Sequence, residues 1–133
     1  MPSQKRILIV EDHEDLRFIL TTQLQRLGPF TILEATNGQE ALALLAQEAV
    51  DLIFMNLQLP VLDGWETTRR IRALPRPVGD VPIIAFTAYA LPGDETKALT
   101  AGCDDYLTKP VLDLSVMKQK VDRLLASGRP RQP

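Results

Sequence analysis

Two adjacent carboxylates, Glu11 and Asp12, directly follow a short apolar run and are the first side chains along the sequence that suggest chemistry. Mg²⁺ prefers oxygen ligands, and proteins bind it through one or two carboxylates together with water and phosphate oxygens. A plainer interpretation is that the two acids stabilise the start of the following helix, because negative charge is favourable at a helix N-terminus. Taken alone, the pair favours the plainer interpretation.

Polar residues at the ends of three later apolar runs change that balance. Asn56, Thr87 and Lys109 each stand where such a run ends. A hydroxyl and an ammonium group across from the acid pair could hold the oxygens of a phosphoryl group while a metal ion neutralises their charge. This chemistry requires a fold that brings the ends of all four runs together.

The apolar runs themselves predict buried strands of a parallel sheet. Residues 7–10, 52–55 and 82–86 are continuous, largely apolar stretches, which are typical of strands covered on both faces. A mixed stretch at 30–35 predicts a strand nearer the edge, and a weaker stretch at 105–108 completes the alternation. Five strands are therefore expected.

Apolar residues with helical spacing separate these strands. The predicted stripe of the first helix consists of Leu16, Ile19, Leu20, Leu24 and Leu27. Gly28 follows at the position of a left-handed C-cap. A short helix at 94–101 is expected to end at Gly102, and the last helix is expected to have Asp113 as its N-cap. The predicted stripe of that last helix consists of Leu114, Met117, Val121 and Leu124.

Two capping boxes mark the helices in the middle of the chain. Asn37 with Glu40 forms one box, and Asp63 with Glu66 forms the other. Pro75 is expected to stop the second of these helices. The side chains that the two helices are predicted to bury are Ala41, Leu44, Leu45, Ile71 and Leu74.

Strand and helix therefore alternate five times, which predicts an α/β fold with a doubly wound, five-stranded parallel sheet. In that architecture the functional crevice lies at the carboxyl ends of the strands. The 133 residues correspond to one domain, expected over 1–126, followed by a flexible tail at 127–133. Since no second domain fits, we expect any effect to come through contact with another protein or through self-association.

Charge and cysteine content narrow the function classes. The formal net charge of −2 at pH 7 argues against binding nucleic acid through bulk charge. The single Cys103 cannot form an internal disulfide, which fits a reducing compartment. The apolar run at 7–10 is too short for a signal peptide or a membrane span. We therefore expect a cytoplasmic protein without membrane association.

Several further residues have ordinary structural interpretations. A solvated helix face is predicted for the four arginines Arg69, Arg70, Arg72 and Arg76. Cys103 is expected to be a small packed side chain and Trp65 to be partly buried. His13 is expected to face solvent, because Mg²⁺ has little affinity for imidazole.

The motifs at the strand ends resemble those of the receiver domain of bacterial two-component response regulators, the CheY-like domain. The matching segments are Glu11-Asp12 after the first strand, 57–64 after the third, Thr87-Ala88 after the fourth and 102–110 around the fifth. The match covers residues 5–126, and the combination of motifs is highly specific. The resemblance implies a flavodoxin-like (βα)5 fold with strand order 2-1-3-4-5.

The resemblance also implies roles for individual residues. The expected Mg²⁺ site comprises Glu11, Asp12, Asn56 and the backbone carbonyl of Gln58. The expected phosphate site and switch comprise Asn56, Thr87 with its hydroxyl, Ala88, the aromatic ring of Tyr106, and Lys109, whose ammonium would pair with phosphate. A cis bond between Lys109 and Pro110 is implied as well.

One position departs from the family. The phosphoacceptor aspartate belongs at the end of the third strand, where this chain has Asn56. A carboxylate oxygen can attack phosphorus to give an acyl phosphate, whereas a neutral carboxamide is a very poor nucleophile. We therefore expect no phosphorylation at Asn56 and weaker Mg²⁺ binding. Either a natural pseudo-receiver or an engineered, non-phosphorylatable variant of an ordinary receiver fits this sequence.

The resemblance implies a signalling switch that contacts a histidine kinase or a histidine phosphotransfer protein. Homodimerisation through the face of the fourth helix, fifth strand and fifth helix is a further expectation. An Mg²⁺-dependent phosphohydrolase of the haloacid dehalogenase type is the alternative from another class. Such an enzyme needs an aspartate nucleophile and usually a second acid two residues on, but Asn56 and Gln58 are both amides. A dinucleotide or flavin carrier is disfavoured because no Gly-rich loop follows the first strand.

Overall fold

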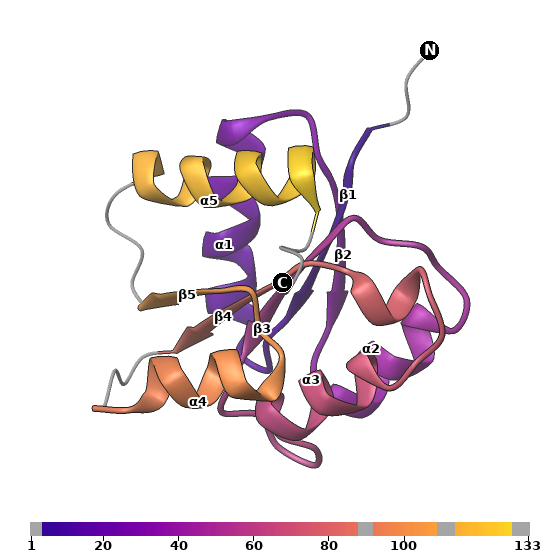
Figure 1. The fold of residues 1–133 in the computed structure, drawn as a ribbon. Coiled ribbons are helices and arrows are strands. Elements are labelled where there is room, and N and C mark those ends of the chain that lie inside the picture. The colour runs from indigo at the N-terminus through magenta and orange to yellow at the C-terminus, as the bar shows by residue number, and fades with distance from the viewer. Residues whose placement is uncertain (1–3, 88–91, 109–113, 129–133) are drawn as a thin grey trace.

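A parallel sheet forms the centre of the molecule, and the computed structural model describes its residues 4–87, 92–108 and 114–128. The strand order is β2-β1-β3-β4-β5, as predicted (Figure 1). The strands are β1 (Arg6–Val10), β2 (Thr31–Ala35), β3 (Leu52–Asn56), β4 (Ile83–Thr87) and β5 (Asp105–Thr108). The helices are α1 (Glu14–Leu27), α2 (Gly38–Leu45), α3 (Gly64–Arg72), α4 (Asp94–Ala101) and α5 (Leu114–Ser127), and a short 3₁₀ helix, η1 (Val78–Asp80), precedes β4. The edge position predicted for 30–35 is confirmed, because β2 is an edge strand.

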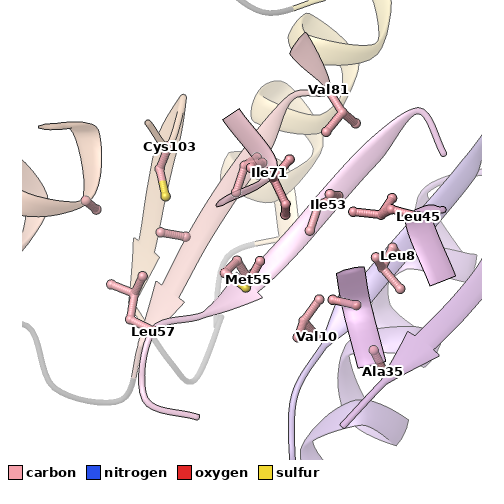
Figure 2. Close-up of a cluster of buried hydrophobic side chains, with 14 residues drawn as sticks. Leu8, Val10, Ala35, Leu45, Ile53, Met55, Leu57, Ile71, Val81 and Cys103 are labelled. Atoms are coloured by element: carbon pink, nitrogen blue, oxygen red, sulfur yellow. The ribbon is translucent and has the colours of Figure 1, made fainter. Parts of the chain in front are cut away.

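Two hydrophobic layers lie on opposite faces of this sheet. α1 and α5 cover one face, and α2, α3 and α4 cover the other (Figure 1). In β1, Ile7 and Ile9 belong to the first layer, whereas Leu8 and Val10 belong to the second, which Figure 2 shows. Successive side chains of a strand point to opposite faces, so a strand covered on both sides needs an unbroken apolar run. The predicted buried strands are confirmed on this basis.

The strand register aligns the ends that carry polar residues. Val10 of β1 lies opposite Met55 of β3, so Glu11 and Asn56 both stand one residue further along at the same edge. Thr87 follows the residue of β4 that lies opposite Asn56. The carboxyl ends of three neighbouring strands therefore meet.

The predicted stripe of α1 is wrong at Ile19, which is 51% exposed. Leu20 and Leu24 are buried against the sheet, and Leu16 and Leu27 are half-buried. Consecutive residues of a helix are about 100° apart around its axis, so Ile19 turns away when Leu20 faces the sheet. The stripe is therefore narrower than the apolar pattern predicts.

The left-handed conformation predicted for Gly28 is also wrong. Its φ of 175° and ψ of 174° are extended. The next residue is Pro29, and the ring of a proline pushes the preceding residue into extended conformations. The chain therefore leaves α1 straight and enters β2 within three residues.

Both predicted N-caps are confirmed in the middle of the chain. The Asn37 side chain accepts a hydrogen bond from the Glu40 N–H at 2.9 Å, and the Asp63 side chain accepts one from the Glu66 N–H at 2.8 Å. The reciprocal half of the box is not formed as predicted. The Glu40 carboxylate accepts from the Thr36 N–H, and Glu66 pairs with arginines further along α3.

The end of α3 differs from the prediction. The helix ends at Arg72, so Leu74 lies beyond it and is 36% exposed instead of buried. Pro75 explains the early end, because a residue before proline avoids the helical region. Ile71, on the last helical turn, is fully buried as predicted. Leu44 of α2, also predicted to be buried, is only half-buried.

The solvated face predicted for the arginines is wrong at Arg72, whose side chain is only 12% exposed. Its guanidinium donates to the carbonyls of Gly79, Val81 and Gly102 at 2.6 to 3.1 Å. It also forms an ion pair with Asp104 at 2.8 Å. The side chain therefore joins α3 to the segments that precede β4 and β5. In contrast, Arg69, Arg70 and Arg76 are exposed.

Other structural expectations are borne out in part within the described residues. In the stripe predicted for the last helix, Met117, Val121 and Leu124 are buried, whereas Leu114 is only half-buried. Cys103 is buried, Trp65 of α3 is half-buried against the core layer under α2, α3 and α4, and the side chain of His13 is exposed. α5 continues through Ser127, the first residue of the predicted tail. Asp113 and the Lys109–Pro110 bond lie outside the described residues. In the part of the chain that is described, no helix is long and apolar enough to cross a membrane.

Candidate functional site

Glu11 is the most deeply buried acid at the carboxyl edge of the sheet. It is fully buried, and its backbone N–H continues the pairing of β1 with β2 by donating to the Ala35 carbonyl at 3.0 Å. Its carboxylate oxygen Oε2 accepts from the His13 N–H at 3.2 Å and from the Asn56 side chain at 3.0 Å. A buried carboxylate is costly unless such donors satisfy it, so these two contacts fix its position.

Asn56 connects the first and third strands through its side-chain amide. The residue is 4% exposed, and its Nδ2 donates to Glu11 Oε2 at 3.0 Å and to the Gln58 carbonyl at 3.2 Å. Its Oδ1 accepts from the Gln58 N–H at 3.1 Å. The orientation of the amide follows from its partners, because a backbone N–H can only donate and a carboxylate or carbonyl oxygen accepts.

The loop after Asn56 returns directly to the site at the start of α3. The Gly64 N–H donates to the Leu57 carbonyl at 3.1 Å. A Cβ at Gly64 would lie 2.2 Å from the Asn56 carbonyl oxygen, so only glycine allows α3 to begin so close to the end of β3. Within the loop, Val61 has a φ of 68°, which is a strained conformation for a β-branched residue.

Asp12 has an oxygen without a hydrogen-bond partner among the described residues. This oxygen, Oδ1, is buried, and His13 Nδ1 is 3.5 Å away. Burial alone would raise the pKa of this carboxyl. A hydrogen bond from its own backbone and the nearby His13 oppose burial, and the pKa of Asp12 lies below its usual value. The charged form is therefore the favoured one.

Sequence reasoning missed Arg17, one turn into α1. Its guanidinium donates to the backbone carbonyls of Glu11 at 2.9 Å and Asp12 at 3.2 Å, and it pairs with Glu34 at 3.3 Å. These bonds fix the backbone that carries both acids. An arginine five residues after the acid pair gives no signal of this kind, because the carbonyls that it binds are set by the turn and not by the side-chain pattern.

Thr87 and Tyr106 come from the neighbouring strands. Thr87 ends β4 and is buried. Tyr106 lies opposite Ala85 in the β4–β5 register and packs against the layer of α2, α3 and α4. Its hydroxyl is buried without a hydrogen-bond partner among the described residues. Burial, reinforced by the negative charges of Asp94 and Glu95, raises the pKa of Tyr106.

The structure therefore brings together four of the predicted residues: Glu11, Asp12, Asn56 and Gln58. Thr87 stands at the adjacent strand end, whereas Ala88 and Lys109 lie outside the described residues. The donor set suits a hard cation, since it consists of two carboxylates and a backbone carbonyl, and Asp12 Oδ1 has no protein partner among the described residues. Side-chain atoms of Glu11, Asp12 and His13 lie within 4.8 Å of one another.

Comparison with known proteins agrees with this geometry. The family model described as "Response regulator receiver domain" matches residues 7–122. A two-component response regulator of Oryza sativa subsp. japonica is 37% identical over 127 residues, covering 93% of this chain and 94% of its own. A probable transcriptional regulator of Guillardia theta is 37% identical over 110 residues, which are 83% of this chain but only 41% of that protein.

Solved structures give the same result. The receiver domain of the sensor histidine kinase PA1611 from Pseudomonas aeruginosa PAO1, solved with a magnesium ion in its active-site cleft, superposes with a TM-score of 0.83. It is 36% identical, and the match covers 94% of this chain and all of that one. Together with the polar residues gathered at the ends of β1, β3 and β4, these findings establish that the chain belongs to the response regulator receiver domain family.

Proposed function

We propose that this receiver domain serves two-component signalling in a form that is not phosphorylated at residue 56 and acts through protein contacts. The observation that carries the proposal is the Asn56 carboxamide at the end of β3, hydrogen-bonded to Glu11 and Gln58. A carboxamide lacks the nucleophilic oxygen that would attack phosphorus. The rest of the expected site is present in the sequence, including Thr87 and Lys109.

Mg²⁺ would be held by Glu11, Asp12 and the Gln58 carbonyl, and it would supply positive charge against the oxygens of a phosphoryl group. Asn56 contributes no charge where the family has an aspartate, so we propose that the affinity for Mg²⁺ is lower than in an ordinary receiver. The oxygen-rich donor set and the favoured charged form of Asp12 support a residual site.

Histidine kinases or histidine phosphotransfer proteins are the proposed partners. Self-association through α4, β5 and α5 is a second expectation, supported by the exposed Leu99 and Val116 on these helices. Receiver domains generally serve as signalling domains, and we propose that this chain has no enzymatic activity of its own. A phosphohydrolase is less well supported, because both expected acids are the amides Asn56 and Gln58. A cytoplasmic location remains a prediction from the sequence.

Treatment with acetyl phosphate and Mg²⁺, followed by intact mass measurement, tests the proposal. We expect one added phosphoryl group on an Asn56→Asp variant and none on the unaltered chain. A phosphorylated unaltered chain would show that another residue accepts phosphate. Failure of the Asn56→Asp variant to react would contradict the assignment of residue 56 as the acceptor position, provided that its circular dichroism shows a folded protein.

A further inference from the structure

We propose that the side-chain amide of Asn56 is a built-in substitute for the metal ion, so that Mg²⁺ must displace it in order to bind. The proposal rests on the function proposed above and deepens it. The Asn56 Nδ2 donates to Glu11 Oε2 at 3.0 Å and to the Gln58 carbonyl at 3.2 Å. These are two of the three groups that would hold the cation, and one NH₂ group already joins them.

The polarity of the amide supports this arrangement. Oδ1 of Asn56 accepts from the Gln58 N–H at 3.1 Å, which leaves Nδ2 facing the two oxygens. Rotating the amide by half a turn would place Oδ1 against two acceptors and the NH₂ group against a donor. Each buried polar group would then lack a partner, which is costly. The amide is therefore held with its positive end where a cation would be attracted.

Burial strengthens the contact by which the Asn56 amide takes the place of a metal ion at Glu11. Glu11 is fully buried, and its Oε2 receives hydrogen bonds from the Asn56 amide and from the His13 N–H. A carboxylate in such surroundings is stabilised by any donor or cation that reaches it. Because the Asn56 amide already satisfies Glu11, it lowers the gain that Mg²⁺ would obtain from the same oxygen.

This proposal differs from a simple loss of charge. If Asn56 weakened Mg²⁺ binding only by lacking a negative charge, Asn56→Ala would bind Mg²⁺ no better, because alanine is also neutral and offers no oxygen. If the amide competes with the cation, Asn56→Ala removes the competitor and leaves Glu11 and the Gln58 carbonyl accessible. The two accounts therefore predict opposite directions for the same variant.

The experiment is a Mg²⁺ titration of the full chain and of the Asn56→Ala, Asn56→Ser and Asn56→Asp variants, followed by isothermal calorimetry and by the Mg²⁺-dependent rise in Tm. We expect Asn56→Ala to bind Mg²⁺ at least fivefold more tightly than the unaltered chain, and Asn56→Asp to bind more tightly still. Asn56→Ser leaves a smaller cavity but keeps a hydroxyl, so its result is interpreted together with that of Asn56→Ala. Asn37→Ala is the matched control, because it removes an asparagine that caps α2 and should change Tm without changing Mg²⁺ affinity.

Nuclear magnetic resonance on the unaltered chain gives a measurement that needs no variant at residue 56. Saturating Mg²⁺ should shift the side-chain NH₂ resonances of Asn56 and the backbone N–H of Gln58, while the NH₂ resonances of Asn37 stay in place. If these Asn56 resonances are unmoved when Mg²⁺ is bound, the amide does not yield to the cation and the proposal is wrong.

The outcomes separate this proposal from the function on which it rests. Equal or weaker Mg²⁺ binding by both Asn56→Ala and Asn56→Ser would overturn the competition while leaving the phosphorylation result untouched. A folded Asn56→Asp variant that binds no Mg²⁺ would overturn both the competition and the proposed metal site. Tighter binding by the alanine and serine variants would support the competition alone.

Discussion

Two clusters of polar side chains lie at opposite ends of the central strands and are satisfied in different ways. At the amino end of β4, Arg72 and Asp104 form an ion pair at 2.8 Å, and the remaining donors of Arg72 reach backbone carbonyls. Asp104 also accepts from the Ile83 N–H at 2.8 Å. At the carboxyl end, Glu11 is satisfied by an amide and a backbone N–H, and Asp12 keeps an oxygen without a partner among the described residues.

This difference separates a structural cluster from a binding site. In the Arg72 cluster, opposite charges neutralise each other and their hydrogen bonds go to fixed backbone groups, so no further ligand is required. At the carboxyl end, the described donors to the Glu11 carboxylate are neutral, and the exposed His13 lies beside Asp12. The guanidinium of Arg17 binds the backbone carbonyls of both acids, but its charge is paired with Glu34. An excess of negative charge near the surface attracts a cation, whereas a neutral, saturated cluster does not.

The largest expected effect comes from breaking the ion pair at the amino end. Arg72→Ala should lower the free energy of unfolding by about 3 kcal/mol, because it leaves the Asp104 carboxylate buried without its partner. Urea denaturation measures this loss. Arg69→Ala is the matched control on the same helix, since Arg69 is exposed and its replacement should cost less than about 1 kcal/mol. A similar small cost at both positions would mean that the Arg72 cluster is not a structural anchor.

Adding a negative charge beside Glu11 and Asp12 should have the next largest effect on the free energy of unfolding. Asn56→Asp places a third carboxylate beside Glu11 and Asp12, and unit charges about 4 Å apart repel by about 4 kcal/mol at an effective dielectric of 20. Allowing for screening, we expect a loss of about 2 kcal/mol without metal. Mg²⁺ should restore much of it. Parallel thermal melts with and without Mg²⁺ measure both the loss and its recovery. An equal Mg²⁺ response in the unaltered chain and in Asn56→Asp would contradict the prediction.

Relief of backbone strain in the loop after β3 should change the free energy of unfolding by a smaller amount, and it should raise it instead of lowering it. Val61 has a φ of 68° and is exposed, so its side chain contributes little packing to offset the strained conformation. Val61→Asn should raise the free energy of unfolding by about 1 kcal/mol, because asparagine tolerates the left-handed region. Denaturant melts measure the gain, and Val116→Asn at an exposed position of α5 is a control that should give none.

The smallest effect concerns the unpartnered hydroxyl of Tyr106. Tyr106→Phe should change stability at neutral pH by less than about 1 kcal/mol, because no described residue hydrogen-bonds the hydroxyl. Burial raises the pKa of Tyr106 above the usual value of 10.0. The folded state therefore disfavours ionisation of the phenol. The neutral phenol makes its full contribution to the free energy of unfolding below pH 10, and this contribution is lost as the pH rises through the raised pKa.

Stability measured between pH 8 and about 12 tests this sign. The unaltered chain should lose stability more steeply than Tyr106→Phe above pH 10. Identical alkaline profiles would mean that the phenol is as accessible to ionisation in the folded protein as in the unfolded one.

Most of the fold could be predicted because strands buried on both faces require uninterrupted apolar runs, and the four-residue strand β5 was placed at its observed bounds. The acid pair and Asn56 could be placed at one edge because parallel strands end together. Arg72 could not be predicted in this way, since its partners Gly79 and Gly102 are 7 and 30 residues away. A helical pattern does not say which segment its last turn will contact, and the same reason explains why Arg17 was missed.

The contact between Gly64 and the end of β3 has a practical consequence for following this domain in solution. α3 begins against the Asn56 carbonyl, and the next residue is Trp65, whose ring lies 4.5 Å from the Lys97 ammonium of α4. The chain contains one tryptophan. Its fluorescence emission is therefore an intrinsic optical signal from the point where β3, α3 and α4 meet, and displacement of that ring relative to the ammonium should alter the emission without any added dye.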